Sequence, residues 1–329
     1  MKLTLDQITE AARGVAYIYE EKGIVYLHRF TREQEAFYQK IKDEHYDRTY
    51  STAGVVLEFD TDSTQLSLSV RARKGSSRHW FVCSIFADGE RLGELNGSFT
   101  PPEYAKAEGT WTLKNGIKRI KIVFPWSAGA CIENLTLDDE ASFLPIRPDK
   151  KVLIYGDSIT QGYDASLPEY AYASILAEAL GGNCINKAIG GEVFRPDLAL
   201  LPDAGEIDLI TVAYGTNDWS SKKPEVLEKS AREFYSNLRK MYPNTKIVVL
   251  APVWRVNWQD KKPGGDFLSV APVLQRIAEE IGNTVFLDCL DYIPRDKANY
   301  SPDGVHPNDA GFAYYAQALK VAFEQNGLL

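Results

Sequence analysis

The sequence has little cysteine and little histidine. Its four cysteines stand far apart among 329 residues, and no two of them form a Cys-x-x-Cys pair. This spacing argues against a zinc site and favours free buried thiols in a reducing compartment over disulfides. Only four histidines are present and no His-Glu-x-x-His segment occurs, so the sequence predicts no metal site.

An excess of positive charge and long apolar runs are also lacking. The formal net charge is −8 at pH 7, whereas a nucleic-acid-binding protein is expected to carry a basic excess or stripe. No stretch approaches the roughly 18 apolar residues of a membrane-spanning helix. The first residues contain no apolar core of a secretory signal. We therefore expect neither nucleic acid nor membrane as partner, and a cytoplasmic location.

Between about residues 50 and 140 the sequence is typical of β structure, because apolar and polar side chains alternate. The strand-length runs are 55–59, 65–72, 80–87 and 119–126. Turns are predicted at Asp88-Gly89, Asn96-Gly97 and Asn115-Gly116. The polar segment 31–42 suits a helix or a loop. We expect residues 1–145 to form an all-β, jelly-roll-like sandwich domain.

From residue 146 to residue 329 the pattern is different, because short apolar runs alternate with helix-like segments. The apolar runs are 152–155, 184–185, 207–214, 246–251 and 284–288. The helix-like segments are 170–180, 224–242, 267–281 and 309–325. This alternation predicts a second, α/β domain with a parallel sheet that helices cover on both faces. Active sites of such folds lie at the carboxyl ends of the strands.

A serine follows the first of these strands. Ser158 stands in Gly-Asp-Ser-Ile-Thr-Gln-Gly, directly after the run 152–155. At the end of a strand and the start of a helix, the hydroxyl would be exposed and backbone N–H groups could receive negative charge. The same residues also suit an ordinary turn or helix cap. This segment alone leaves both interpretations open.

One histidine could serve as a base for that serine. A serine hydroxyl is a weak nucleophile and needs a base within hydrogen-bond reach. His306 is the only histidine after residue 79, and it lies just before the last predicted helix. Asp303, three residues earlier, could accept a hydrogen bond from the imidazole and set its tautomer. If the α/β half holds a serine–histidine catalyst, its histidine is His306; otherwise the segment is an ordinary loop beside a helix start.

Two further segments carry candidate donors for a developing oxyanion. Asn217 lies in Tyr-Gly-Thr-Asn-Asp, at the end of the run 207–214. Gly190 and Gly191 follow the short run at 184–185. An amide side chain and a glycine N–H, together with the N–H of Ser158, could supply three donors. Taken singly these segments are weak signals, because Gly and Asn are common in turns.

The four segments occur in one order, and together the sequence resembles the SGNH hydrolases, also called GDSL esterases. The motifs of that family are a GDS block, a Gly block, a GxND block and a DxxH block, and all of them match between about residues 150 and 325. The residues that the resemblance implies are the nucleophile Ser158, the triad partners Asp303 and His306, and the oxyanion donors Asn217 and Gly191, with Gly190 as the alternative glycine. The resemblance also implies a flavodoxin-like α/β/α fold and no metal or organic cofactor.

Aromatic and polar residues near these motifs point to the substrate. The loop 252–258 contains Trp254 and Arg255, and Tyr163 and Trp219 flank the other motifs. Aromatic faces suit sugar rings and arginine suits their hydroxyls, so we treat these four as candidate substrate-binding residues. Packing in the core or at the rim is the alternative for each ring. A β domain before such a hydrolase domain also resembles the two-domain carbohydrate acetylesterases.

The predicted activity is hydrolysis of short acyl esters, most readily acetyl esters of a small molecule or oligosaccharide. An alternative is a lipid or thioester hydrolase, or an acyltransferase, with the same triad. The polar residues at 254–257 argue mildly against a broad apolar lipid groove. A further alternative is a non-catalytic carbohydrate-binding protein, against which the complete set of motif residues argues.

Overall fold

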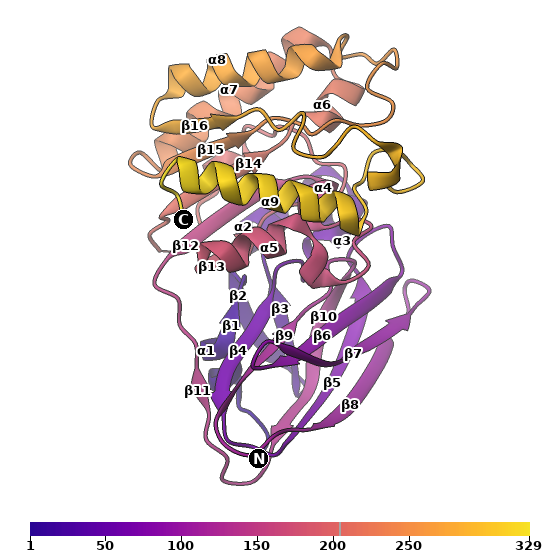
Figure 1. The fold of residues 1–329 in the computed structure, drawn as a ribbon, viewed down its shortest axis with the longest axis vertical. Helices are drawn as coiled ribbons and strands as arrows, with labels where there is room; N and C mark the ends of the chain where they lie inside the picture. Colours follow the sequence, from indigo (N-terminus) through magenta and orange to yellow (C-terminus); the bar gives the residue numbers. More distant parts are fainter. Residues whose placement is uncertain (204) are drawn as a thin grey trace. The chain divides into compact units, whose positions relative to one another are not determined.

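The computed structural model describes residues 1–203 and 205–329. Two compact units make up the chain (Figure 1). The first comprises Met1–Asp149, Leu167–Glu169 and Asn183–Ile185; the second comprises Lys150–Ser166, Tyr170–Gly182 and Asn186–Leu329. Strands dominate the first unit, whereas strands and helices alternate in the second. The change of sequence pattern near residue 146 thus accompanies a change of architecture.

Two antiparallel sheets form the first unit. One has the order β1 (Ala12–Arg13), β4 (Val56–Thr61), β9 (Lys118–Val123), β6 (Trp80–Ala87) and β7 (Glu90–Ser98), and β11 (Leu144–Pro145) pairs with β4. The other has the order β2 (Tyr17–Glu21), β3 (Ile24–His28), β10 (Ala128–Leu137), β5 (Gln65–Lys74) and β8 (Ala105–Thr112). The helices of this unit are α1 (Leu5–Ala11), α2 (Arg32–Ile41) and α3 (Asp43–Thr49).

Alternation of side chains explains the core of this unit. In β5, Leu66 and Leu68 are buried, whereas Ser67 between them is partly exposed. Buried apolar side chains from both sheets belong to one hydrophobic cluster. Burial of this apolar surface from both sheets stabilises the unit.

Most sequence predictions for this unit are confirmed, and one is wrong. The four predicted strands correspond to β4, β5, β6 and β9, and the segment left as helix or loop is helix α2. Asp88-Gly89 turns between β6 and β7, and both residues have positive φ. Asn96-Gly97, by contrast, lies inside β7 rather than in a turn. Gly97 is needed there for packing, because a Cβ on it would come within 3.0 Å of the Phe81 ring.

A five-stranded sheet forms the centre of the α/β part of the chain, and its strands belong to the second unit except for Asn183–Ile185 of the edge strand. Its order is β13 (Asn183–Asn186), β12 (Lys151–Gly156), β14 (Leu209–Ala213), β15 (Lys246–Leu250) and β16 (Thr284–Leu287). The pairs β12–β14, β14–β15 and β15–β16 are parallel. In chain order the strands read 2-1-3-4-5, which is the flavodoxin-like arrangement. The predicted α/β fold is therefore confirmed.

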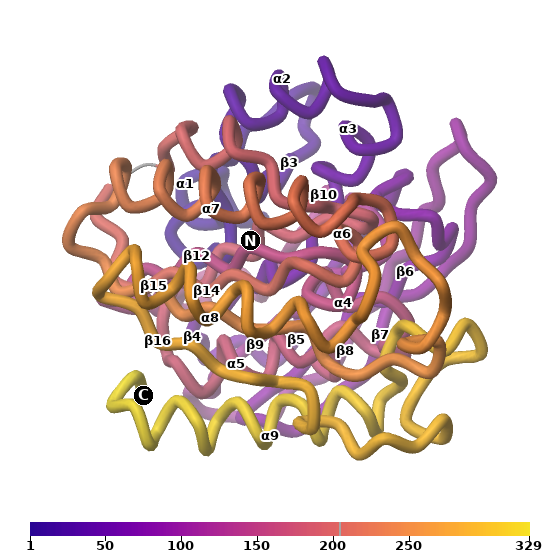
Figure 2. Tube along the Cα trace, turned by 90° about the horizontal axis from the view of Figure 1, so that it is seen from above, coloured from indigo at the N-terminus to yellow at the C-terminus, as the bar shows by residue number. Residues whose placement is uncertain are grey.

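Amphipathic helices cover this sheet in two layers. The helices are α4 (Ser158–Gln161), α5 (Tyr172–Leu180), α6 (Thr216–Ser221), α7 (Pro224–Met241), α8 (Val270–Ile281) and α9 (Asp309–Gln325). Helices α7 and α8 pack together on one side of the strands, and α5 and α9 pack together on the other (Figures 1 and 2). In α7 the buried positions Leu227, Ala231 and Leu238 repeat at helical spacing. Between the two layers, the strand order reverses at β12 and β14, where such folds place their sites.

Two further expectations concern the chain as a whole. Cys83, Cys131, Cys184 and Cys289 are free and buried, as their spacing predicts. Within the described part of the chain, none of the helices has both the length and the apolar character that crossing a bilayer requires.

Candidate active site

Ser158 begins helix α4 immediately after strand β12. The turn is tight, because a Cβ at Gly156 would overlap the side chain of Thr160. Asp157 caps the helix by accepting a hydrogen bond of 2.9 Å from the Ile159 N–H. Thr160 in turn shares a hydrogen bond with Tyr172 of α5. These contacts hold the Ser158 hydroxyl at the carboxyl end of the sheet.

His306 contacts both Ser158 and Asp303, the other two residues of the predicted triad. Its Nε2 lies 2.7 Å from Ser158 Oγ, and its Nδ1 lies 2.5 Å from Asp303 Oδ2. The loop that carries both residues is bonded to itself, since Asp303 Oδ1 accepts from the N–H groups of Val305 and His306. Gly304 adopts the positive φ of 67° that the turn requires. The structure therefore brings Ser158, His306 and Asp303 into one hydrogen-bonded line.

The carboxyl groups around this line differ in electrostatics. Burial alone would raise the pKa of Asp303, but the hydrogen bond and charge of His306 and two backbone N–H groups hold that pKa well below its usual range. Burial raises the pKa of Asp157 to about 7, and the N–H of Ile159 and the charge of His306 oppose this rise. Asp303 is therefore an anion over the whole working range of pH, whereas Asp157 titrates near neutrality.

The predicted oxyanion donors lie on the neighbouring segments. Asn217, on α6, donates from Nδ2 to the carbonyl of Glu192 at 3.0 Å, which ties it to the residue after Gly191. Gly190 N–H already donates to Gln161 Oε1 at 2.8 Å. The N–H groups of Gly191 and Ser158 have no hydrogen-bond partner in residues 1–203 or 205–329. Between the two glycines this favours Gly191 as the available donor.

A buried ion pair fixes α6 against the glycine segment. Asp218 accepts hydrogen bonds from the N–H of Phe194 and, at 2.7 Å, from Lys222 Nζ. The Asp218 side chain is fully buried, and Lys222 keeps about a fifth of its side chain exposed. Burial raises the pKa of Asp218, and the Lys222 charge counteracts that rise. The aspartate of the GxND block thus positions Asn217 rather than facing a substrate.

The structure separates the four candidate substrate-binding residues. Trp219 is fully buried, with its indole N–H bonded to Gly265 O, so its ring has no face for a substrate. Trp254 is 8% exposed and packs against Tyr300. Tyr163 is also buried, and it stacks on the His306 ring at 5.3 Å. These contacts favour the packing alternative for the three rings.

Arg255, the fourth candidate, donates to neutral oxygens on two elements. Its Nη1 bonds Thr216 Oγ1 at 2.9 Å and Ser220 Oγ at 3.2 Å, and its Nε bonds Asn257 Oδ1 at 2.6 Å. Its guanidinium lies over the ring of Trp219, 5.2 Å from the centroid. The arginine therefore connects the loop after β15 to the helix that carries Asn217.

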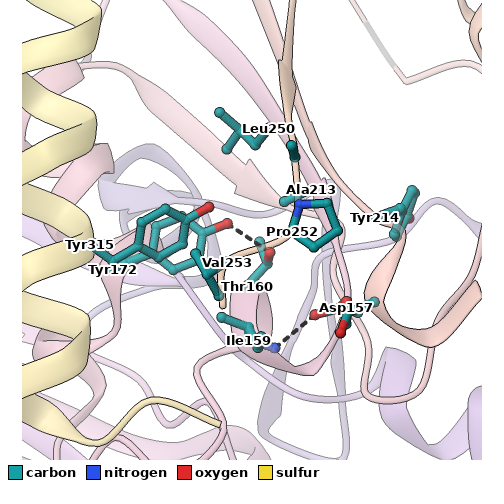
Figure 3. Close-up of a pocket in the computed structure, with 12 residues that line it drawn as sticks. Asp157, Ile159, Thr160, Tyr172, Ala213, Tyr214, Leu250, Pro252, Val253 and Tyr315 are labelled. Atoms are coloured by element: carbon teal, nitrogen blue, oxygen red, sulfur yellow. Dashed lines mark hydrogen bonds between the residues drawn. The ribbon is translucent and has the colours of Figure 1, made fainter. Parts of the chain in front are cut away.

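A small cavity is lined by Asp157 and Ile159, the two neighbours of the candidate nucleophile in the sequence (Figure 3). Its volume is about 20 Å³, which suits a single water molecule and excludes a substrate. The lining also includes Thr160, Tyr172 and Pro252. The cavity is therefore too small to be a substrate pocket.

One residue near His306 did not appear among the sequence predictions. Asp164 follows Tyr163 with a positive φ of 69°, and its Oδ2 lies 3.9 Å from His306 Nδ1. Within the described ranges, Asp164, Asp303 and His306 are also the one group of three side chains whose ligand-type atoms lie within 4.8 Å of one another. The sequence signal is weak, because an aspartate beside a glycine turn is common.

Comparison with known proteins shows which family the sequence around this site resembles. The model of the GDSL-like Lipase/Acylhydrolase family matches residues 154–314. The GDSL lipase Rv0518 of Mycobacterium tuberculosis is 29% identical in an alignment of 206 positions that covers 54% of this chain and 84% of that protein. The segment 154–314 that the family model matches contains every motif residue of the candidate site.

Solved structures resemble the chain over nearly its whole length. The salicylyl-acyltransferase SsfX3 from a tetracycline biosynthetic pathway has a TM-score of 0.83 at 21% identity, with 97% of this chain and 95% of that chain covered. A putative GDSL-like lipase from Bacteroides ovatus has a TM-score of 0.77 at 19% identity, covering 99% and 97%. A family two carbohydrate esterase from Clostridium thermocellum has a TM-score of 0.64 at 16% identity, covering 93% and 100%. At these identities the likeness concerns the fold. The family match confirms the resemblance to SGNH hydrolases, and residues 154–314 form a GDSL-like lipase/acylhydrolase domain.

Proposed function

We propose that the protein is a serine esterase that cleaves short acyl esters, most readily acetyl esters of carbohydrates. The observation that carries the proposal is the hydrogen-bonded line from Ser158 Oγ through the two ring nitrogens of His306 to Asp303. A serine with a base at 2.7 Å, itself oriented by a carboxylate, is the arrangement that acyl transfer needs. No metal or organic cofactor enters this mechanism.

In the first half of the reaction, Ser158 Oγ attacks the carbonyl carbon of the ester while its proton moves to His306 Nε2. Asp303 accepts the hydrogen bond from Nδ1 and stabilises the imidazolium that forms. The tetrahedral intermediate then collapses, the bond to the alcohol oxygen breaks, and the alcohol takes the proton from Nε2. The products of this half are the free alcohol and an acyl ester on Ser158.

Water completes the second half by the same route. It gives a proton to His306 Nε2 as its oxygen attacks the acyl carbon, and the second tetrahedral intermediate releases the carboxylic acid and regenerates Ser158. The negative oxygen of both intermediates faces the N–H groups of Gly191 and Ser158 and the amide of Asn217. The N–H groups of Gly191 and Ser158 have no other partner in the described residues, so they need no rearrangement when charge develops. The Asn217 amide has a second N–H besides the one that is bonded to the Glu192 carbonyl.

Carbohydrate acetyl esters are the substrates that the fold likeness supports. Several solved structures with this fold over most of the chain are carbohydrate esterases of family two, including the one from Clostridium thermocellum in complex with cellohexaose. The polar loop with Arg255 and Asn257 also suits a hydroxylated substrate better than a long acyl chain. We further propose that residues 1–145 form a jelly-roll-like accessory domain and that residues 146–329 form the hydrolase domain.

Acyl transfer to an alcohol is the second candidate. The fold match to a salicylyl-acyltransferase, with a TM-score of 0.83, favours it. The acyl-enzyme would be the same, and only the acceptor that attacks it would differ. An acyltransferase must let the acceptor alcohol compete with water, so the partition of the acyl group between the two separates the candidates.

The first experiment asks whether there is esterase activity at all. Wild-type protein and the Ser158→Ala variant are assayed with p-nitrophenyl acetate. We expect turnover by the wild type and loss of at least about 10³-fold in the variant. Equal rates would mean that Ser158 is not the nucleophile, and a folded wild type without turnover would favour a binding protein.

The second experiment identifies the substrate class. Acetylated oligosaccharides are compared with p-nitrophenyl esters of rising acyl length, with and without added alcohol acceptors. We expect preference for acetyl groups and release of free acetate. Faster cleavage of octanoyl esters would indicate a lipase, and transfer of most acyl groups to the acceptor would indicate an acyltransferase.

A further inference from the structure

Arg255 is a buried cation without an anionic partner. The residue is only 6% exposed, and in the described chain no carboxylate oxygen lies within 4.0 Å of its guanidinium. Its hydrogen-bond partners are the two hydroxyls of Thr216 and Ser220 and the amide oxygen of Asn257. Burying a charge without a counter-ion is costly, so proteins rarely retain one unless it has a use.

The neighbouring cations of the site show how unusual this is. Lys222 pairs with Asp218 at 2.7 Å, and Arg195 pairs with Glu192 at 2.6 Å. In both pairs the carboxylate is fully buried. Among the described residues, two cations next to the Asn217 segment thus have a carboxylate within 4.0 Å, whereas Arg255 has none.

The guanidinium also has unused donors. Nε makes one hydrogen bond and Nη1 makes two, which leaves both N–H groups of Nη2 without a partner in the described residues. Nη2 is not among the fully enclosed unbonded atoms. The small exposed part of the side chain therefore includes it, and an anion from outside the chain can reach it.

Arg255 stands beside the candidate catalytic groups. Its two hydroxyl partners, Thr216 and Ser220, flank Asn217 on α6. The next residue, Val256, donates its N–H to the carbonyl of Gly304, between Asp303 and His306. The guanidinium is close enough to Asp157 and Asp303 for their charges to act on it. A ligand at Nη2 would thus be held next to the reacting ester.

We infer that Arg255 binds a carboxylate carried by the substrate, so that the enzyme prefers esters that also bear a negative charge. The inference rests on the proposed esterase function and narrows its substrate class. The carboxylate has two possible sources: the alcohol half, as in an acetylated uronic acid, or the acyl half, as in a dicarboxylic half-ester. A charge-assisted hydrogen bond from arginine is short and strong, and the planar guanidinium is already oriented by its three other bonds.

Each source is tested by a pair of substrates that differ only in charge. For the alcohol half, acetylated methyl glucuronoside is compared with methyl glucoside acetylated at the same hydroxyl. For the acyl half, the p-nitrophenyl half-ester of succinate is compared with its methyl ester. We expect kcat/KM of the wild type to be at least about tenfold higher for the charged member of one pair, the effect of one charge-assisted hydrogen bond.

Variants separate substrate binding from support of α6. Arg255→Met should bring the charged-to-neutral ratio close to one, and Arg255→Lys should keep part of it because the charge remains. Ser220→Ala weakens the anchoring of α6 but leaves the guanidinium in place, so it should keep the wild-type ratio. Arg276→Met, which removes a surface charge paired with Glu228, should also keep it. The inference would be overturned if the wild-type ratio of kcat/KM for the charged and the neutral substrate were near one in both substrate pairs. It would also be overturned if Arg255→Met lowered kcat/KM equally for the charged and the neutral substrate.

Ligand binding to a variant that lacks the nucleophile can be measured whether or not the protein is an esterase. It therefore tests the role of Arg255 separately from the proposed activity. Calorimetry compares glucuronate with glucose, and monomethyl succinate with dimethyl succinate, on Ser158→Ala protein with and without the Arg255→Met change. We expect the charged ligand of one pair to bind at least tenfold more tightly, and only when Arg255 is present. Equal binding of charged and neutral ligands would overturn the inference even if the esterase were active. Selective binding by a protein without turnover would overturn the esterase proposal alone.

Discussion

Each unit of the molecule holds a close histidine–carboxylate pair, and the two pairs have the same separation. In the first unit His28 Nδ1 lies 2.5 Å from Glu35, and in the second His306 Nδ1 lies 2.5 Å from Asp303. The pairs differ at the opposite ring nitrogen. Nε2 of His306 meets the Ser158 hydroxyl, whereas Nε2 of His28 has no hydrogen-bond partner in the described parts of the chain. An oriented imidazole is thus catalytic machinery only when a nucleophile faces its other side.

The surroundings of the two pairs lead to the same conclusion. His28 stacks on Tyr17 at 4.5 Å, and the Tyr17 hydroxyl donates to Glu35, so strand β2, strand β3 and helix α2 are held together. The His28 side chain is about 5% exposed, against 15% for His306. A buried polar network that ties three elements together in this way specifies packing. A partly exposed pair at the carboxyl end of a parallel sheet is open to substrate.

The largest expected effect separates the two histidines by activity. Replacing His306 or Ser158 with alanine should lower kcat by about 10³-fold or more, because the first proton transfer needs both groups. Far-ultraviolet circular dichroism should show a folded protein in each case. Near-wild-type turnover in either folded variant would remove the proposed mechanism.

The matched control is His28→Ala. Here we expect a lower unfolding midpoint, since the variant leaves Glu35 and Tyr17 without their buried partner. The kcat of its folded fraction should stay close to that of the wild type. A folded His28→Ala variant as inactive as His306→Ala would abolish the distinction between a structural and a catalytic pair.

A smaller loss is expected from the oxyanion donor. Asn217→Ala should lower kcat by about 10²–10³-fold and change KM less, because the amide acts mainly on charge that develops in the transition state. The control is Asn237→Ala. Asn237 lies on helix α7, and its amide also donates to a backbone carbonyl, that of Pro196. Its kcat should be unaffected. An effect of Asn217→Ala on KM alone would instead make Asn217 a residue that binds the ground state.

The second unit could be predicted from its sequence better than the first, for a physical reason. Buried parallel strands are continuous apolar runs, and amphipathic helices repeat at 3.6 residues, so both patterns are strong. Ser158 and Asn217 follow strands β12 and β14 within a few residues, and parallel strands bring their carboxyl ends together although these residues are far apart in sequence. His306 stands instead in the loop before α9, from which its Nε2 reaches Ser158 Oγ.

Strands of the first unit carry weaker signals. Strand β8 is Ala-Lys-Ala-Glu-Gly-Thr-Trp-Thr, in which small and polar residues hide the alternation, and β10 begins with Ala-Gly-Ala-Cys. The Asn96-Gly97 dipeptide resembles a turn but serves the packing of Phe81. Ring burial likewise depends on tertiary contacts, so Trp219 could not be assigned to the core from its position beside a motif.

Asp157 is a buried carboxyl group that, unlike Asp303 and Glu35, has no hydrogen bond to a histidine in the described part of the chain. Its pKa is raised to about 7 by burial, against about 3.9 in an unfolded chain. The folded protein therefore binds this proton more tightly, and stability falls as pH rises from about 4 to about 7, by at most about 1.4 kcal/mol per pH unit. Asp157→Asn cannot ionise and keeps an oxygen for the Ile159 N–H. Its urea midpoint should rise relative to the wild type between pH 5 and pH 8; an unchanged difference would contradict the argument.

Asp164 should have a milder effect on the catalytic pair. Its carboxylate lies 3.9 Å from His306 Nδ1, where a negative charge stabilises the imidazolium that forms in each proton transfer. In Asp164→Asn kcat should fall a few-fold, since a charge at about 4 Å near water is worth about 1 kcal/mol. Asp291→Asn, a surface carboxylate paired with Arg295, is the control. Equal kcat values for all three proteins would show that Asp164 does not act on His306.

The smallest expected effect is that of metal removal. Asp164, Asp303 and His306 have the spacing of a metal site, but His306 Nδ1 already donates to Asp303 in the proposed mechanism. A cation there would replace that bond, take away the carboxylate that orients the ring, and make Nε2 a poorer base. Activity should therefore be the same with and without EDTA, and added Zn²⁺ should inhibit the wild type more than the Asp164→Asn variant, which lacks one ligand. Loss of activity in EDTA that a divalent ion restores would show instead that these three residues hold a working metal, and the serine–histidine pair would then be only part of the site.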